Sequence, residues 1–205
     1  MELTWALILA ASRDIVAESV AVRTGRWQTS VGRELAGRVL GALGLGRIGA
    51  RVARIGVAFG MEVIAWSQNM TKESAAEAGA TYVAKDELFA RSDVLTIHLK
   101  LSERSTGLVG AAELALMRPT ALLVNTSRGP IVDEPALVDA LRSGTIGGAA
   151  LDVFDTEPLP AGDPLRALDN VLATPQIGYV ADHGYHVFYR DAVAVIAGWL
   201  DRQGS

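Results

Sequence analysis

Cysteine is absent from this 205-residue sequence. The absence excludes disulfide bonds and thiolate metal sites, and it is compatible with a reducing cytoplasm. The sequence also lacks any apolar run near the roughly eighteen residues that a membrane-spanning helix needs. Basic residues do not outnumber acidic ones, since the net charge is −4. We therefore expect a cytoplasmic protein whose partners are neither nucleic acids nor membranes.

Short apolar runs alternate with helical patterns along the chain, which is typical of a parallel sheet covered by helices on both faces. Half of the residues are hydrophobic, enough for a sizeable core. The sequence predicts one doubly wound α/β domain in three layers over residues 1–205, with its core at 38–180. The predicted strands span 39–43, 62–66, 94–99, 121–125, 148–153 and 171–174, and the helices between them span 47–59, 72–78, 85–90, 111–117 and 134–142.

Two further helices flank this alternation. The first, predicted over 3–22, is apolar on nearly every side in its first half. Such a helix must be covered on several faces, which favours an arm that forms a homodimer over simple packing on its own domain. The second is predicted over 182–200, and packing on the domain remains an open alternative for it. Its apolar stripe consists of Phe188, Ala192, Val195, Ile196 and Trp199.

Gly44, Gly46 and Gly49 form the pattern G-x-G-x-x-G. The pattern directly follows a predicted strand and opens a predicted helix, which is the context of a dinucleotide-binding fingerprint. The first glycine makes a tight turn, the second lets backbone approach a pyrophosphate, and the third lets helix and strand pack closely. Arg47 and Ile48 then offer backbone N–H groups to phosphate oxygens. The motif predicts a Rossmann-type fold that binds NAD or NADP.

The end of the second predicted strand bears on which of these dinucleotides binds. Rossmann-type folds place an acidic residue there to bind the ribose hydroxyls. In this sequence Ser67, Gln68 and Asn69 follow the strand instead. Ser67 can hydrogen-bond a ribose but does not repel a 2′-phosphate, and Lys72 is close along the chain. NAD versus NADP therefore stays open, with NAD favoured because no clear phosphate clamp follows.

Thr126, Ser127 and Arg128 come directly after strand 121–125, at the edge where open parallel sheets bind ligands. The guanidinium of an arginine is a planar fork that matches a carboxylate. Arg128 is therefore a candidate for binding an anionic ligand. A salt bridge with a nearby acidic residue is the alternative role for this side chain.

Three more polar residues are expected at the same edge. Asp152 and Glu157 lie at and beyond the end of strand 148–153. A carboxylate there could orient and polarise a neighbouring base, although Glu157 fits a solvent-facing loop acid equally well. His98, near the end of strand 94–99, either lines the nicotinamide side of the site or is a structural, hydrogen-bonded histidine.

Four segments together resemble the nucleotide-binding domain of the D-isomer-specific 2-hydroxyacid dehydrogenases. They are LGLGRIG, NTSRGPIVDEPALVDALRSG, AALDVFDTEPLP and LATPQIGYV. The resemblance is to the phosphoglycerate and glyoxylate/hydroxypyruvate reductase group and covers residues 2–200. It implies hydride transfer between a nicotinamide and C2 of a 2-hydroxy or 2-keto acid. It also implies that residues 1–22 correspond to the family's dimerisation arm.

The resemblance assigns roles to individual residues. Arg128 matches the arginine that binds the carboxylate and carbonyl of the substrate. Glu157 matches the acid that partners the catalytic histidine. Asp152 matches a residue that contacts the nicotinamide amide, and Thr126 and Ser127 lie where backbone meets the cofactor.

The sequence departs from the family at two places. Gln176 stands where the family has the histidine of its TPHIG motif, with the spacing from Glu157 preserved. Glutamine donates a hydrogen bond but delivers no proton, so a loss of roughly 10²–10⁴-fold in turnover is expected. Gly178, in the same loop, is assigned to the cofactor site. The family also carries a substrate-binding domain before this region, and we expect these residues to supply only half of the active-site cleft.

Three interpretations follow. The chain is a dehydrogenase-family domain that is inactive or nearly so, a non-catalytic module that binds nucleotide and dimerises, or a structural protein without a ligand. The intact glycine motif disfavours the third. A small 2-keto or 2-hydroxy acid is expected to bind only where the second domain is supplied.

Overall fold

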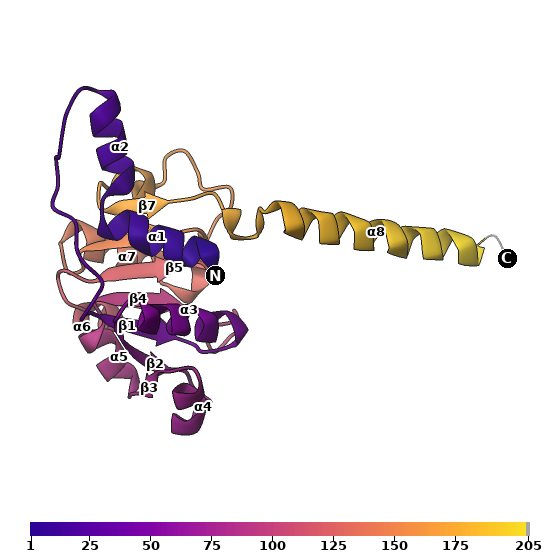
Figure 1. Cartoon of the computed structure of the whole chain (residues 1–205), viewed down its shortest axis with the longest axis horizontal. Helices are drawn as coiled ribbons and strands as arrows, with labels where there is room; N and C mark the ends of the chain where they lie inside the picture. Colours follow the sequence, from indigo (N-terminus) through magenta and orange to yellow (C-terminus); the bar gives the residue numbers. More distant parts are fainter. Residues whose placement is uncertain (204–205) are drawn as a thin grey trace.

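The computed structural model describes residues 1–203 and contains one parallel sheet (Figure 1). The sheet has seven strands in the order β3-β2-β1-β4-β5-β6-β7, and every neighbouring pair is parallel. After β3 the chain crosses over to β4, which lies beside β1 and begins the other half of the sheet, so the sheet is doubly wound as predicted. The strands are β1 (Val39–Leu43), β2 (Glu62–Trp66), β3 (Thr81–Tyr82), β4 (Val94–Ile97), β5 (Leu122–Asn125), β6 (Gly148–Leu151) and β7 (Val171–Ala173).

Helices connect the strands and flank the sheet. The connecting helices begin and end within two residues of the predicted positions. The α-helices are α1 (Glu2–Ser12), α2 (Ile15–Arg23), α3 (Arg47–Ala58), α4 (Lys72–Glu77), α5 (Lys85–Arg91), α6 (Ala111–Leu116), α7 (Glu134–Arg142) and α8 (Asp182–Gln203), and the short 3-10 helices are η1 (Gly129–Ile131), η2 (Pro164–Ala167) and η3 (Ile177–Tyr179). Within residues 1–203, no helix has both the length and the apolar character to cross a membrane.

Alternate side chains along each strand point to opposite faces of the sheet, which gives the domain two cores. Val94 packs on the face covered by α1 and α3, and the next residue, Leu95, packs on the face covered by α5, α6 and α7. The predicted three layers are therefore present. Of the seven strands of this sheet, only β3 was not predicted, because a two-residue strand is too short to show a periodic pattern.

The amino-terminal segment differs from the prediction of one helix. The helix ends at Ser12, and Asp14 adopts a left-handed backbone conformation with φ of 49° before α2 begins. In α1, Leu7 is only 3% exposed and Ile8 is fully buried, both against this chain's own sheet. The sheet of the same chain therefore covers these side chains, so their burial does not require a partner chain. The exposed apolar side chains lie instead on α2 and in the segment that follows it.

Helix α8 runs away from the sheet rather than packing on it (Figure 1). Phe188 is 71% exposed, and Val195, Ile196 and Trp199 are also more than half exposed. The predicted apolar stripe therefore exists, but the alternative in which it packs on this domain is wrong. His183 and His186 lie on the exposed surface of the same helix.

Candidate functional site

Most of the predicted site residues lie in one cleft of about 400 Å³. The cleft opens at the carboxyl ends of β1, β4, β5, β6 and β7, where open parallel sheets bind ligands. Four predicted residues lie outside its lining: Gly44 and Gly49 support it from below, and Ser67 and Glu157 lie beyond it. The predicted residues that line the cleft are Gly46, Arg47, Ile48, His98, Thr126, Ser127, Arg128, Asp152, Gln176 and Gly178.

The turn between β1 and α3 explains why each of its glycines is needed. Gly44 has a φ of +100°, a conformation that side chains disfavour, and a Cβ there would lie 2.9 Å from the carbonyl oxygen of His98. A Cβ on Gly49 would lie only 2.2 Å from the carbonyl oxygen of Gly44. Gly46 differs, because its Cβ would meet no atom within 4 Å. The protein itself requires the first and third glycines, whereas the second leaves room that a ligand can use.

The amino end of α3 supplies hydrogen-bond donors beside that open space. Gly46 caps the helix without a side chain, and the N–H of Ala50 is the first to bond back, to the carbonyl of Gly46 at 2.9 Å. The helix therefore has no internal acceptors for the N–H groups of Arg47, Ile48 and Gly49. Its first turn carries no acidic residue. This arrangement fits the diphosphate of a dinucleotide.

The end of β2 lies beside the glycine turn. The N–H of Gly44 donates a hydrogen bond of 2.9 Å to the carbonyl of Trp66, the residue before Ser67. Ser67 is half-buried, and no carboxylate stands at this strand end. The position matches the ribose end of a dinucleotide whose diphosphate lies at α3.

A buried asparagine shapes the loop that carries Arg128. Asn125 donates to the carbonyl of Arg128 at 2.9 Å and accepts from the N–H of Ser127 at 3.0 Å. A Cβ on Gly129 would lie 2.1 Å from the backbone of Phe154, so this loop packs directly on the loop after β6. This role of Asn125 was not predicted from the sequence, because the burial of the amide is seen only in the folded structure.

Arg128 itself is exposed, and its Nη1 donates to the carbonyl of Ser127 at 2.6 Å. Within residues 1–203 it forms no ion pair with an acidic residue. The salt-bridge alternative is therefore not what this structure contains. The remaining donors of the guanidinium are available to an anion at the mouth of the cleft.

Helix α1 reaches the same cleft, which the sequence did not predict. Thr4 is buried, and its hydroxyl lies 3.0 Å from the hydroxyl of Thr126. Met1 and Leu3 also line the cleft. The two hydroxyls are far apart in the sequence, so no local pattern marks their contact.

Asp152 controls the loop that carries Gln176. Its carboxylate is buried and accepts hydrogen bonds from the hydroxyl of Thr174 at 2.6 Å and from the N–H groups of Ile177 and Gly178, both at 2.9 Å. Gln176 lies between these anchors in the left-handed conformation, with φ of 52°. It lines the cleft, at the position to which the resemblance assigns the histidine of the family.

Glu157 does not join this arrangement. Its Oε1 accepts a hydrogen bond of 3.0 Å from the N–H of Phe154, three residues earlier. The side chain is exposed and, among the described residues, forms no hydrogen bond with Gln176. The structure therefore supports the alternative of a loop acid for Glu157 and not the pairing with position 176 that the resemblance implied.

His98 lines the floor of the cleft beside the glycine turn. Its Nε2 lies 3.0 Å from the hydroxyl of Thr96, which is fully buried. Burial lowers the pKa of His98 to about 4, and the positive charge of the amino terminus adds to this effect. The imidazole is therefore neutral near pH 7.

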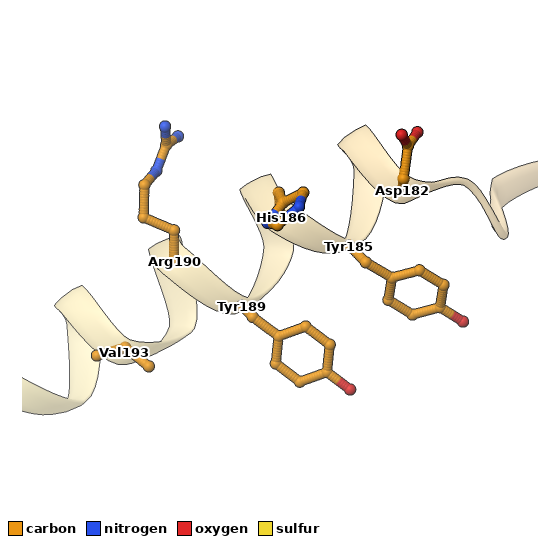
Figure 2. Close-up of a pocket in the computed structure, with 6 residues that line it drawn as sticks. All are labelled: Asp182, Tyr185, His186, Tyr189, Arg190 and Val193. Carbon is orange, nitrogen blue, oxygen red and sulfur yellow. The ribbon is translucent and has the colours of Figure 1, made fainter.

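A second hollow lies along α8 and, unlike the cleft, is lined by residues of one helix. Figure 2 shows that its lining residues all come from this one helix, with Tyr185 and Tyr189 pointing to one side and Arg190 to the other. The two tyrosine rings are stacked, with centroids 6.0 Å apart. Within residues 1–203 no second element closes this hollow, so it is the open surface of an exposed helix and not a binding cleft for a small molecule.

We predict that the imidazole of His98 titrates near pH 4, which NMR of its ring protons measures. Since an unfolded histidine binds a proton near pH 6.5, the unfolded state gains protons that the folded state excludes between pH 6.5 and 4. The free energy of unfolding therefore falls as the pH falls through this range. His98→Asn should remove that part of the pH dependence. Titration of the ring near pH 6.5 in the folded protein would contradict the burial argument.

Comparison with known proteins agrees with this geometry. Residues 5–178 match the family model described as the D-isomer specific 2-hydroxyacid dehydrogenase, NAD binding domain. A glyoxylate reductase of Aeropyrum pernix is 50% identical over 183 residues, which are 85% of this chain and 55% of that protein. A D-3-phosphoglycerate dehydrogenase of Methanocaldococcus jannaschii is 42% identical over 86% of this chain and 34% of its own length. The chain thus spans about half the length, or less, of these relatives.

Solved structures give the same result. A phosphoglycerate oxidoreductase from Vibrio cholerae superposes with a TM-score of 0.91 at 39% identity, over 96% of this chain and 65% of that one. A D-lactate dehydrogenase from Aquifex aeolicus, solved with NAD and lactic acid, gives 0.86 at 31% identity, over 98% of this chain and 65% of that one. The chain belongs to the D-isomer specific 2-hydroxyacid dehydrogenase family, and residues 5–178 form its NAD-binding domain.

Proposed function

We propose that the cleft binds a nicotinamide dinucleotide with its diphosphate at the amino end of α3. The single observation that carries this proposal is the empty space at Gly46, bordered by the unpaired N–H groups of the first turn of α3. The adenosine end then lies toward Ser67, and the nicotinamide end lies toward Asp152 and Gln176. The complex of the Aquifex aeolicus D-lactate dehydrogenase with NAD supports the choice of ligand class.

NAD is the proposed dinucleotide, in preference to NADP. No arginine or lysine follows Ser67 directly, so the sequence after this strand offers no basic side chain to pair with a 2′-phosphate. The nearest basic side chain along the chain, Lys72, begins helix α4 on the exposed surface. Because no carboxylate repels a 2′-phosphate either, the preference should be modest, and NADPH should bind more weakly than NADH but measurably.

Hydride transfer to or from a 2-keto or 2-hydroxy acid is the proposed chemistry of the family site. A bound nicotinamide would supply the hydride in the reduction and accept it in the oxidation. The planar guanidinium of Arg128 would bind the carboxylate of the acid, because its fork matches two oxygens and no ion pair within residues 1–203 engages it. Position 176 would face the carbonyl that needs a proton. Gln176 hydrogen-bonds but has no proton to transfer at neutral pH.

We therefore propose that this chain binds nucleotide with little or no turnover. General acid–base catalysis contributes roughly 10²–10⁴-fold, and Gln176 forfeits that factor. Glu157 does not compensate, since it does not line the cleft and its Oε1 accepts the N–H of Phe154. The second candidate function, a module that binds nucleotide and dimerises without catalysis, differs only in having no residual reaction.

Titration of the chain with NADH and with NADPH, monitored by nicotinamide fluorescence, tests the binding site. Gly46→Val fills the space where no protein atom lies, so it should weaken NADH binding at least tenfold with an unchanged unfolding midpoint. Gly49→Ala is the matched control, because it should lower the unfolding midpoint through its contact with Gly44. Equal NADH affinity of Gly46→Val and the unsubstituted chain would place the nucleotide elsewhere.

We also propose that the chain forms a homodimer through α2 and the segment after it. Val16 and Val20 of α2 are about half exposed, and Val31 is 95% exposed. Val16 and Val31 line a hollow of about 540 Å³ at the amino ends of the strands. This surface is continuous with α1, so a second copy bound there would extend the core that α1 begins.

Charge substitutions on α2 distinguish this surface from the buried helix α1. Val16→Asp with Val20→Asp should give monomers in sedimentation velocity with little change in the unfolding midpoint, since both side chains are exposed. Leu7→Asp is the contrasting variant and should unfold the domain, because Leu7 is buried in its core. A monomeric unsubstituted chain, or a dimer that survives both α2 substitutions, would refute the proposed interface.

A further inference from the structure

We propose that Asp152 is a positioning residue that acts on Gln176 through the backbone of the loop 174–178. Family resemblance assigns Asp152 a direct contact with the nicotinamide amide. The geometry of this chain adds a second use of its carboxylate, which accepts hydrogen bonds from the loop on both oxygens. The inference rests on the proposed function only for its ligand measurements.

The carboxylate is held in place before it binds the loop. The N–H of Asp152 donates to the carbonyl of Asn125 at 3.0 Å, which continues the ladder between β5 and β6. The side chain is only 2% exposed. Because its backbone is fixed by the sheet and its side chain is surrounded, Asp152 is a rigid anchor at the end of β6.

Three donors from the loop converge on this anchor. The Thr174 hydroxyl and the Ile177 N–H reach Oδ1, and the Gly178 N–H reaches Oδ2. The fit is close, since a Cβ on Gly178 would lie 3.0 Å from Oδ2. The donors flank position 176 on both sides, so they fix its backbone without touching its side chain.

The backbone at position 176 indicates why such an anchor is needed. A residue other than glycine is strained in the left-handed conformation, and Gln176 is in that conformation. The three hydrogen bonds to the Asp152 carboxylate hold the loop in place against this strain. Without them the loop should relax, and the side chain at position 176 should leave its place at the cleft.

Two substitutions separate this role from direct contact with a ligand. Asp152→Asn must turn an amide N–H against one of the loop donors, whichever way it is oriented. Thr174→Val removes one donor and keeps the shape of the side chain, and Thr174 does not line the cleft. Ser92→Ala is the control. The buried hydroxyl of Ser92 donates a hydrogen bond to the carbonyl of Leu88, and it lies before β4, at the amino ends of the strands and away from the cleft.

Amide hydrogen exchange tests the anchor without any ligand. Asp152→Asn and Thr174→Val should speed exchange at Ile177 and Gly178 at least tenfold, more than in Ser92→Ala. Unchanged exchange in Asp152→Asn would overturn the proposal, whatever the ligand measurements give.

Binding of NADH and of ADP-ribose, which lacks the nicotinamide, tests the consequence at the cleft. Both loop variants should bind NADH about tenfold more weakly and ADP-ribose within about twofold of the unsubstituted chain. If Asp152→Asn alone weakens NADH, the contact is direct and the proposal fails; if both ligands weaken equally, the effect is a general loss of structure and the proposal also fails. An unsubstituted chain that binds neither ligand refutes the proposed function, while hydrogen exchange still decides the role of Asp152.

Discussion

The close packing of the first turn of α3 on the end of β1 is the constraint on which the nucleotide site depends. Any side chain at Gly49 would overlap the carbonyl of Gly44 and push the helix away from the sheet. With the helix held close, its unpaired N–H groups border the open space at Gly46. The same turn rests on the backbone of His98, so β1, α3 and β4 support the site together.

The rest of the cleft is built from buried polar side chains that hold loops rather than from side chains that reach for a ligand. Asn125 holds the loop after β5, Asp152 holds the loop after β7, and Thr4 ties α1 to Thr126. Each of these groups is hydrogen-bonded within the protein, which helps to hold the cleft in shape before a ligand arrives. Arg128 is left free to bind an anion, and position 176 is left facing the cleft without a proton to give.

Local patterns carried most of the prediction of fold and site, because strands and the glycine turn are specified by neighbouring residues. Contacts between residues far apart in the sequence could not be predicted from local patterns. The bond between Thr4 and Thr126 joins the two ends of a long chain segment, and the break at Asp14 depends on how α1 fits the sheet. Glu157 had the right spacing from Gln176, yet its carboxylate turned to its own loop, a choice that spacing does not encode.

The central claim is that an intact nucleotide site is combined with a missing proton donor. Oxidation of NADH by glyoxylate or hydroxypyruvate, assayed at NADH concentrations shown to saturate the chain, tests it most directly. The account predicts turnover below about a hundredth of the roughly 10 s⁻¹ that is typical of enzymes. If the turnover of the chain with Gln176 in place reaches or exceeds about a hundredth of this typical rate, the reaction takes its proton from another group, and the account is wrong.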